Sequence, residues 1–162
     1  MSLGFVDYLF HKEPKPETVK YVDVDRYCAH PWYEIERIPY YYERGLRNVV
    51  AQYSKLPDGT LQVLNQGVNE YGEIKQSIGT ATADDETNSK LHVTFFWPFS
   101  GEYWIVKLDD NYEYSVVSDS DREYLWILSS TPKMNPKRLD EIHSWLGQNG
   151  YDVSKLETTI QG

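Results

Sequence analysis

The feature that most constrains the fold is a series of short segments, from residue 30 to residue 129, in which apolar and polar side chains alternate. Because successive side chains of a strand point to opposite faces, this alternation predicts half-buried β-strands. The predicted strands cover residues 30–37, 48–56, 60–69, 73–82, 90–97, 102–108, 112–118 and 122–129. Turn residues such as Pro57, Asp58 and Gly59 separate them at the spacing of an antiparallel meander. The predicted fold class is therefore all-β, an eight-stranded antiparallel up-and-down barrel with room for one small ligand.

The periodicity changes after residue 132, where apolar residues recur at helical spacing. Leu139, Ile142 and Leu146 fall on one helical face. Asn135 can cap the start of this helix, and Pro136 suits its first turn. We expect one helix over about 136–149, packed outside the barrel, and then a short extended segment over 153–160.

The length of 162 residues allows one domain with a packed core or with a core wrapped around a cavity. We expect an N-terminal arm over residues 1–28, and a barrel with its helix and a short terminal strand over residues 29–162. The chain contains 14 Tyr and 5 Trp. These side chains combine bulk with a polar group, which suits a pocket wall, although β-rich domains favour aromatic residues in any case.

Charge and cysteine content exclude several classes of function. The net charge of −9 argues against nucleic acid as a partner, and any membrane contact is expected to be only peripheral. Cys28 is the only cysteine and the 4 histidines are scattered, so no disulfide within the chain, no metal site and no cofactor are predicted. No apolar run approaches the roughly 20 residues of a transmembrane helix. No secretory signal or lipidation site is visible.

The first predicted strand carries an unusual carboxylate. Alternation places Trp32, Glu34 and Glu36 on one face, and Tyr33, Ile35 and Arg37 on the other. If Trp32 faces inward, Glu34 does too, and a buried carboxylate needs a partner. We expect Glu34 to be protonated or paired with a cation such as Lys107, or the ligand head to lie at the mouth instead. The alternative is an edge strand with a solvated acidic face.

The loop after this strand carries three successive tyrosines, Tyr40, Tyr41 and Tyr42. Exposed aromatic side chains are unfavourable unless they contact something. This loop is predicted to be a lid over a pocket mouth, and packing on neighbouring loops is an equally simple interpretation.

Several motifs can be read together. They are Trp32-Tyr33-Glu34-Ile35 after an arm, Tyr124-Leu125-Trp126-Ile127-Leu128-Ser129 followed by Thr131-Pro132, Glu43-Arg44-Gly45, Ala51-Gln52-Tyr53-Ser54, Val63-Leu64-Asn65-Gln66-Gly67 and Asp152-Val153-Ser154-Lys155. With eight strands and one helix, this pattern resembles the lipocalins, and most of all their branch of apolipoprotein D and bacterial outer-membrane lipocalins. The resemblance extends from about Tyr21 to Lys155.

Two positions depart from the family pattern. His30 stands where the family motif Gly-x-Trp has its glycine. Ser130 stands where the family has an arginine that packs across the motif tryptophan. Arg26, Arg37 or Lys133 are the candidates to replace this arginine.

The resemblance implies non-catalytic transport or storage of a small hydrophobic ligand, a fatty acid or lysophospholipid, by a monomer or weak homodimer in the periplasm or at the outer membrane. Carried over by position, the pocket includes Glu34, Tyr53, Asn65, Phe95 and Trp126. Residue type adds Trp97 as apolar wall and Tyr114 as a polar contact to a head group. Trp104 is included although either face of its strand is apolar. Any of these side chains can instead be simple core.

Two other functions remain open at this stage. A lipid-modifying enzyme on the same barrel needs a nucleophile, and Cys28 lies outside the strands, in the arm. His92 shares a face with Thr94 and Phe96, opposite the presumed lining. A protein-interaction module would use the loop of Tyr40 to Tyr42 as its contact surface.

Overall fold

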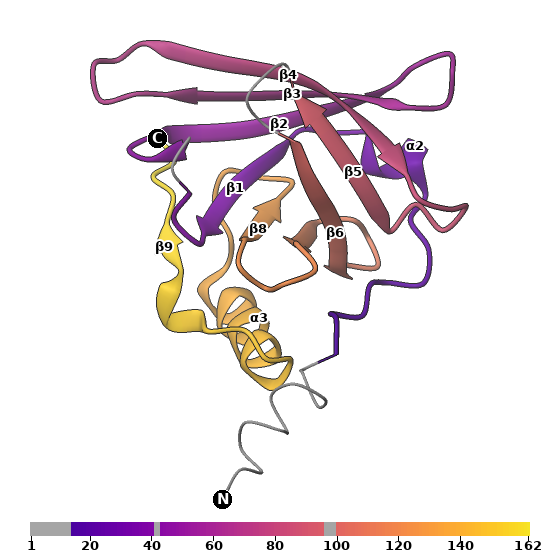
Figure 1. The fold of residues 1–162 in the computed structure, drawn as a ribbon. Coiled ribbons are helices and arrows are strands. Elements are labelled where there is room, and N and C mark those ends of the chain that lie inside the picture. Colours follow the sequence, from indigo (N-terminus) through magenta and orange to yellow (C-terminus); the bar gives the residue numbers. More distant parts are fainter. Residues whose placement is uncertain (1–13, 41–42, 96–99) are drawn as a thin grey trace, which may run out of the picture.

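The computed structural model describes residues 14–40, 43–95 and 100–162. Within them the chain forms one nine-stranded sheet in the order β2-β3-β4-β5-β6-β7-β8-β1-β9, and a further pairing of β2 with β1 closes it into a barrel (Figure 1). The strands are β1 (Trp32–Arg37), β2 (Arg47–Lys55), β3 (Leu61–Val68), β4 (Ile74–Ala83), β5 (Lys90–Phe95), β6 (Ser100–Leu108), β7 (Tyr114–Ser118), β8 (Leu125–Ser129) and β9 (Glu157–Thr158). All pairings are antiparallel. The predicted up-and-down barrel with one C-terminal helix outside it is confirmed.

The helix α3 (Pro136–Gln148) packs on the outer face of the barrel (Figure 1). The Asn135 side chain caps it by accepting a hydrogen bond from the Lys137 amide at 2.8 Å. Its buried residues Ile142 and Leu146 join a core whose barrel side includes outward-facing Val116 and Ile127. Within the described ranges, no helix is both long and apolar enough to cross a membrane.

The C-terminal segment differs in detail from the expected extended run. A 3-10 turn, η2 (Val153–Lys155), interrupts it because the Asp152 side chain accepts a hydrogen bond from the Ser154 amide. The chain then pairs with β1 through β9, and it ends beside β2 (Figure 1).

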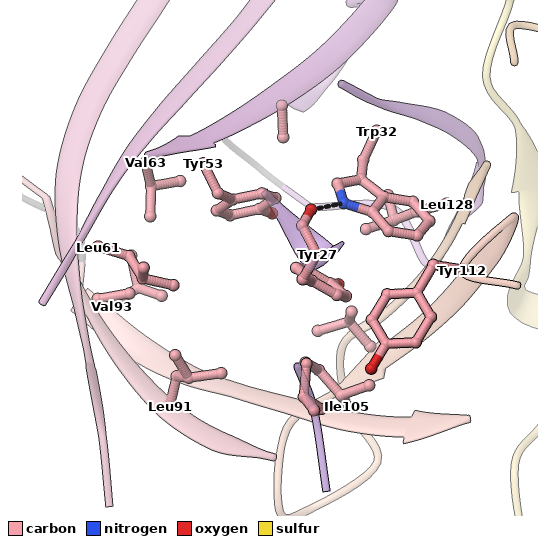
Figure 2. Close-up of a cluster of buried hydrophobic side chains, with 14 of the residues drawn as sticks. Tyr27, Trp32, Tyr53, Leu61, Val63, Leu91, Val93, Ile105, Tyr112 and Leu128 are labelled. Atoms are coloured by element: carbon pink, nitrogen blue, oxygen red, sulfur yellow. Dashed lines mark hydrogen bonds between the residues drawn. The ribbon is translucent and has the colours of Figure 1, made fainter. Parts of the chain in front are cut away.

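One end of the barrel is closed by the residues that precede β1. The helical turn α2 (Val24–Tyr27) was not expected from the sequence, and it lies with Val22 across this end. Trp32 is fully buried there, and its indole nitrogen donates to the Tyr27 carbonyl at 2.9 Å (Figure 2). The tyrosine ring centroid lies 4.8 Å from that of Trp32. Val22, Val24 and Tyr27 therefore cover this end of the barrel.

The residues around Trp32 also show what accompanies the two departures from the family pattern. The His30 ring packs on Trp32 with centroids 4.5 Å apart, so an imidazole occupies space beside the tryptophan. Two of the three candidate substitutes for the family arginine are engaged elsewhere. The Arg26 guanidinium lies 4.2 Å from the centroid of the Tyr112 ring, and Arg37 forms ion pairs within the barrel wall.

Strand β1 does not alternate strictly, which corrects the sequence-based assignment of its faces. Its register against β8 shifts between Glu34 and Glu36, as at a β-bulge. After the shift, Arg37 pairs with Trp126, on the inward face, whereas Glu36 pairs with Ile127 on the outward face. Glu36 therefore contacts His143 of α3, and Arg37 lies on the same side as Glu34.

Candidate ligand-binding cavity

The open half of the barrel contains a cavity of about 680 Å³. Its walls come from strands β1 to β6 and β8, and from the loop between β1 and β2. The lining residues are Trp32, Glu34, Tyr40, Glu43, Leu46, Val49, Ala51, Tyr53, Val63, Asn65, Gln66, Gly67, Lys75, Gln76, Ser77, Ile78, Val93, Phe95, Gly101, Glu102, Tyr103, Trp126 and Leu128. This volume lies within the range of pockets that bind one small molecule.

Apolar side chains form most of the inner wall. They occupy alternate positions of β2, β3 and β5, as the sequence pattern predicted, and include Val49, Ala51, Val63 and Val93. The ring of Phe95 lies across Gly79 of β4, where an added Cβ would stand 2.7 Å from the ring. Glycine at this position therefore allows an aromatic ring to lie flat against the wall.

The floor of the cavity is a chain of buried tyrosine hydroxyls. The Tyr103 hydroxyl is 2.8 Å from that of Tyr53 and 2.8 Å from that of Tyr27, which in turn is 2.8 Å from Ser115 Oγ. Burial raises the pKa of Tyr27, Tyr53 and Tyr103, so all three are neutral near pH 7. Because the Tyr53 hydroxyl is already bonded to Tyr103, Tyr53 presents mainly its ring to the cavity.

A charged cluster of Glu34, Arg37 and Glu43 interrupts the apolar wall. Arg37 Nη1 donates to Glu34 Oε1 at 2.8 Å and lies 3.7 Å from Glu43 Oε2. The other oxygen of Glu43 accepts from the Trp126 indole nitrogen at 2.9 Å. Glu43 Oε2 is itself buried and has no hydrogen-bond partner. Two carboxylates therefore share one guanidinium, and a side-chain hydrogen bond between Glu34 and Glu43 also joins the two carboxyl groups.

The protonation of Glu34 follows from its surroundings. Burial raises the pKa of Glu34 well above its usual range, the neighbouring Glu43 raises it further, and Arg37 opposes both effects. The expectation of a cationic partner is confirmed, but the choice of Lys107 was wrong. The Lys107 ammonium instead lies 5.1 Å from the centroid of the Trp145 ring, outside the barrel. The β1 bulge brings Arg37 to Glu34 in its place.

Aromatic and charged side chains line the mouth. The Tyr40 ring packs edge-on against Tyr124, with centroids 5.0 Å apart, and lies 6.5 Å from the Trp126 ring. Tyr40 thus contacts the neighbouring loop and also lines the cavity. Tyr41 and Tyr42 lie outside the described residues, so the lid remains a prediction for them. Lys75 of β4 adds a cation, whereas the Glu102 carboxylate of β6 accepts hydrogen bonds from the Ser120 amide and hydroxyl.

The structure separates the predicted site residues into two groups. Glu34, Tyr53, Asn65, Phe95 and Trp126 all line the cavity. A ligand contact by any of them stays a prediction. Trp97 lies outside the described residues, and its predicted role stays untested.

Trp104 and Tyr114 were wrongly placed in the lining. In β6 and β7, Ile105 and Val117 face the interior of the barrel. Trp104 and Tyr114 lie on the opposite face, and they belong to the outer core that includes Ile142 and Leu146 of α3. Lys90 lies over the Trp104 ring and Arg138 of α3 lies over the Tyr114 ring. Because both faces of these strands are apolar, alternation alone did not distinguish inside from outside.

The sequence analysis also missed residues that the cavity uses. Arg37 was assigned to the opposite face because strict alternation was assumed. Glu43 lies in an irregular loop, where no periodicity indicates direction, and Lys75 lies on β4 next to the mouth. No local pattern in β1, which also contains Glu36, indicates the bulge that turns Arg37 inward.

Cys28, the candidate nucleophile of an enzyme, lies away from the cavity. Cys28, the C-cap of α2, is half-buried at the closed end, and burial raises the pKa of its thiol. It is therefore held in the less nucleophilic form and is absent from the cavity lining. No three His, Cys, Asp or Glu side chains of the described ranges are grouped as a metal site requires.

The structure is an up-and-down β-barrel with an external helix and an internal cavity, and comparison with known families gives its class. Residues 22–161 match the family model described as "Lipocalin-like domain", so the chain belongs to the lipocalin family. The outer membrane lipoprotein Blc of Escherichia coli (strain K12) is 42% identical over 136 residues, which are 83% of this chain and 76% of that protein. Apolipoprotein D of Bos taurus is 33% identical over 162 residues, 94% and 85% of the two chains.

Solved structures agree on the fold. Insecticyanin from the tobacco hornworm Manduca sexta superposes with a TM-score of 0.72 at 19% identity, over 91% of this chain and 84% of that chain. Lobster apocrustacyanin A1 gives a TM-score of 0.67 at 16% identity, over 91% of each chain. At such identities the likeness extends to the architecture alone.

Proposed function

We propose that this lipocalin binds one single-chain lipid, a fatty acid or a lysophospholipid, for transport or storage without chemical change. The observation that carries the proposal is the cavity of about 680 Å³ with a largely apolar wall. Each methylene group that moves from water into such a cavity contributes about 0.8 kcal/mol. A long acyl chain therefore gains enough to offset the cost of association and bind at micromolar concentration or below.

The charged cluster supports an orientation with the lipid head at the mouth. A free carboxylate deep in the barrel would lie beside Glu34 and Glu43 with only Arg37 to balance them. At the mouth, Lys75 can bind a carboxylate or phosphate.

The remaining parts of the proposal rest on the relatives. The printed names of the bacterial relatives describe outer membrane lipoproteins. We therefore place the protein in the cell envelope, in the periplasm or at the outer membrane, as a monomer or weak homodimer. A non-catalytic role is supported because the half-buried thiol of Cys28 lies at the closed end, away from the cavity.

Mass spectrometry of the purified protein tests the proposal, together with displacement of a fluorescent fatty acid by unlabelled lysophosphatidylethanolamine. We expect a copurified acyl lipid and saturable binding that Ala51→Trp abolishes, because the new side chain fills the cavity. Gln52→Trp is the matched control, since Gln52 is exposed on the other face of β2. A protein that carries no lipid and ignores both probes would refute the proposal.

A further inference from the structure

Strands β1 and β2 separate along the open half of the barrel. Within the described residues they pair only at Trp32 with Ala51 and at Tyr33 with Val50, although β1 continues to Arg37. Beyond Tyr33, the β1 backbone is bulged and turns toward β9. Beyond these two pairs, the cavity wall therefore has a seam between β1 and β2, where the two strands are not hydrogen-bonded to each other.

Residues 159–162, which we term the seam strap, bridge this seam. On one side, the Thr159 amide donates to the Ile35 carbonyl at 2.9 Å. On the other, the Asn48 amide donates to the Ile160 carbonyl at 2.8 Å. The Gln161 side-chain amide spans both strands, donating to the carbonyls of Glu34 at 2.8 Å and Val49 at 2.9 Å. Figure 1 shows this yellow tail rising beside β1 to end next to β2.

The seam strap also reaches a charged residue of the cavity. Thr159 is buried, and its hydroxyl donates to Glu34 Oε1 at 2.7 Å. That same carboxylate oxygen accepts the ion-pair hydrogen bond from Arg37. Thr159 thus fixes the position of a side chain that lines the proposed ligand site, although Thr159 itself does not line the cavity.

We propose that the seam strap completes the ligand-binding site, with Thr159 as a positioning residue for Glu34 and the strap as a detachable closure over a side route between β1 and β2. This inference rests on the proposed binding function. The strap is held mostly by hydrogen bonds, and the Ile160 side chain is exposed. Segments with few buried apolar contacts open at lower free energy than the strands they cover.

The direct test compares the full chain with a chain that ends at Thr158, which keeps β9. Stopped-flow measurements with a fluorescent fatty acid give the association and dissociation rates of both proteins. A new side route raises both rates, and we expect increases of roughly tenfold or more, since removal of a closure speeds passage in both directions. Rates within about twofold of those of the full chain would overturn the closure role.

Point variants test the positioning role. Thr159→Val keeps the shape of the side chain but removes its donation to Glu34, and we expect faster dissociation with unchanged association. Thr158→Val is the matched control, because the side chain of Thr158 is exposed, and it should leave both rates unchanged. Equal dissociation rates for Thr159→Val and the full chain would exclude positioning by Thr159.

Hydrogen exchange of the full chain without ligand separates this inference from the proposed function. We expect the amides of Asn48 and Thr159 to exchange faster than those of central strand β3, because detachment exposes them. Equal protection would contradict the strap as a detachable closure. If the full chain bound no fatty acid but these amides exchanged fast, the proposed function would fail while the closure itself stood.

Discussion

The two halves of the barrel interior differ in how they are filled. The closed half leaves a void of only about 10 Å³, lined by residues such as Val22, Ala81, Leu91 and Ile105. The open half contains the cavity of about 680 Å³. Both halves belong to the same strands, so strand geometry alone does not set the difference. The difference between the halves comes from side chains that enter the barrel from outside the sheet.

The arm before β1 supplies those side chains. Val22 and Tyr27 insert from the arm. Trp32 of β1 packs against the Tyr27 ring (Figure 2). In the open half, inward positions carry smaller groups such as Ala51, Gly67 and Ser77. In a barrel of this size, the interior is packed where a segment of the chain fills it, and it remains a cavity where no segment does.

The largest effect is expected at Trp32. Trp32→Ala removes a fully buried ring from the packed half, and we expect a loss of about 3–5 kcal/mol in the free energy of unfolding. Urea denaturation followed by circular dichroism gives this value. If the variant does not fold, Trp32→Phe should fold with a smaller loss. A loss below about 1 kcal/mol for Trp32→Ala would contradict close packing at this end.

A matched pair of alanines tests the difference between the halves directly. Ala81 lines the small void and Ala51 lines the cavity. Ala81→Leu should overpack the closed half and cost about 1–3 kcal/mol, whereas Ala51→Leu should cost less than about 1 kcal/mol and weaken lipid binding. Urea unfolding and probe titration measure both effects. Equal losses of stability in the two variants would remove the distinction.

The charged cluster gives the open half a dependence on pH. The raised pKa of Glu34 means that the folded chain keeps a proton that the unfolded chain releases above about pH 4.3. Stability should therefore fall as pH rises from there to the folded-state pKa, by at most about 1.4 kcal/mol per pH unit.

Glu34→Gln should lack this fall, because its amide does not titrate. Urea unfolding at several pH values between 4 and 8 makes the comparison, with exposed Glu123→Gln as the control. Parallel pH profiles for the Glu34→Gln variant and the parent would show that Glu34 ionises normally.

The smallest effect is expected outside both halves. Ile74 is 64% exposed on β4 and lines neither void, so Ile74→Thr should change stability by less than about 0.5 kcal/mol. The same urea measurement applies. A loss of more than about 1 kcal/mol in the free energy of unfolding would show that side chains on this face of β4 contribute to core packing.

Much of this architecture could be predicted from the sequence because the signals were local. The family resemblance, carried over by position, placed Asn65 in the lining, and the spacing of Ile142 and Leu146 gave the helix face. The errors arose where both faces of a strand were apolar, or where a bulge interrupted the alternation of side chains. Trp104 lies on a strand with two apolar faces, and Arg37 follows a bulge that alternation does not anticipate. The contact of Thr159 with Glu34 joins residues 125 positions apart, which no local pattern reports.

The difference between a filled and a hollow half is tested most directly by a spin-labelled acyl chain, followed through the NMR signals of side-chain methyl groups. At one equivalent, the account predicts strong broadening of the methyl signals of Val63 and Val93 in the open half. The methyl signals of Val22 and Leu91 should be broadened far less. Uniform broadening of all four, or none at saturating probe, would contradict a ligand-sized hollow confined to the open half.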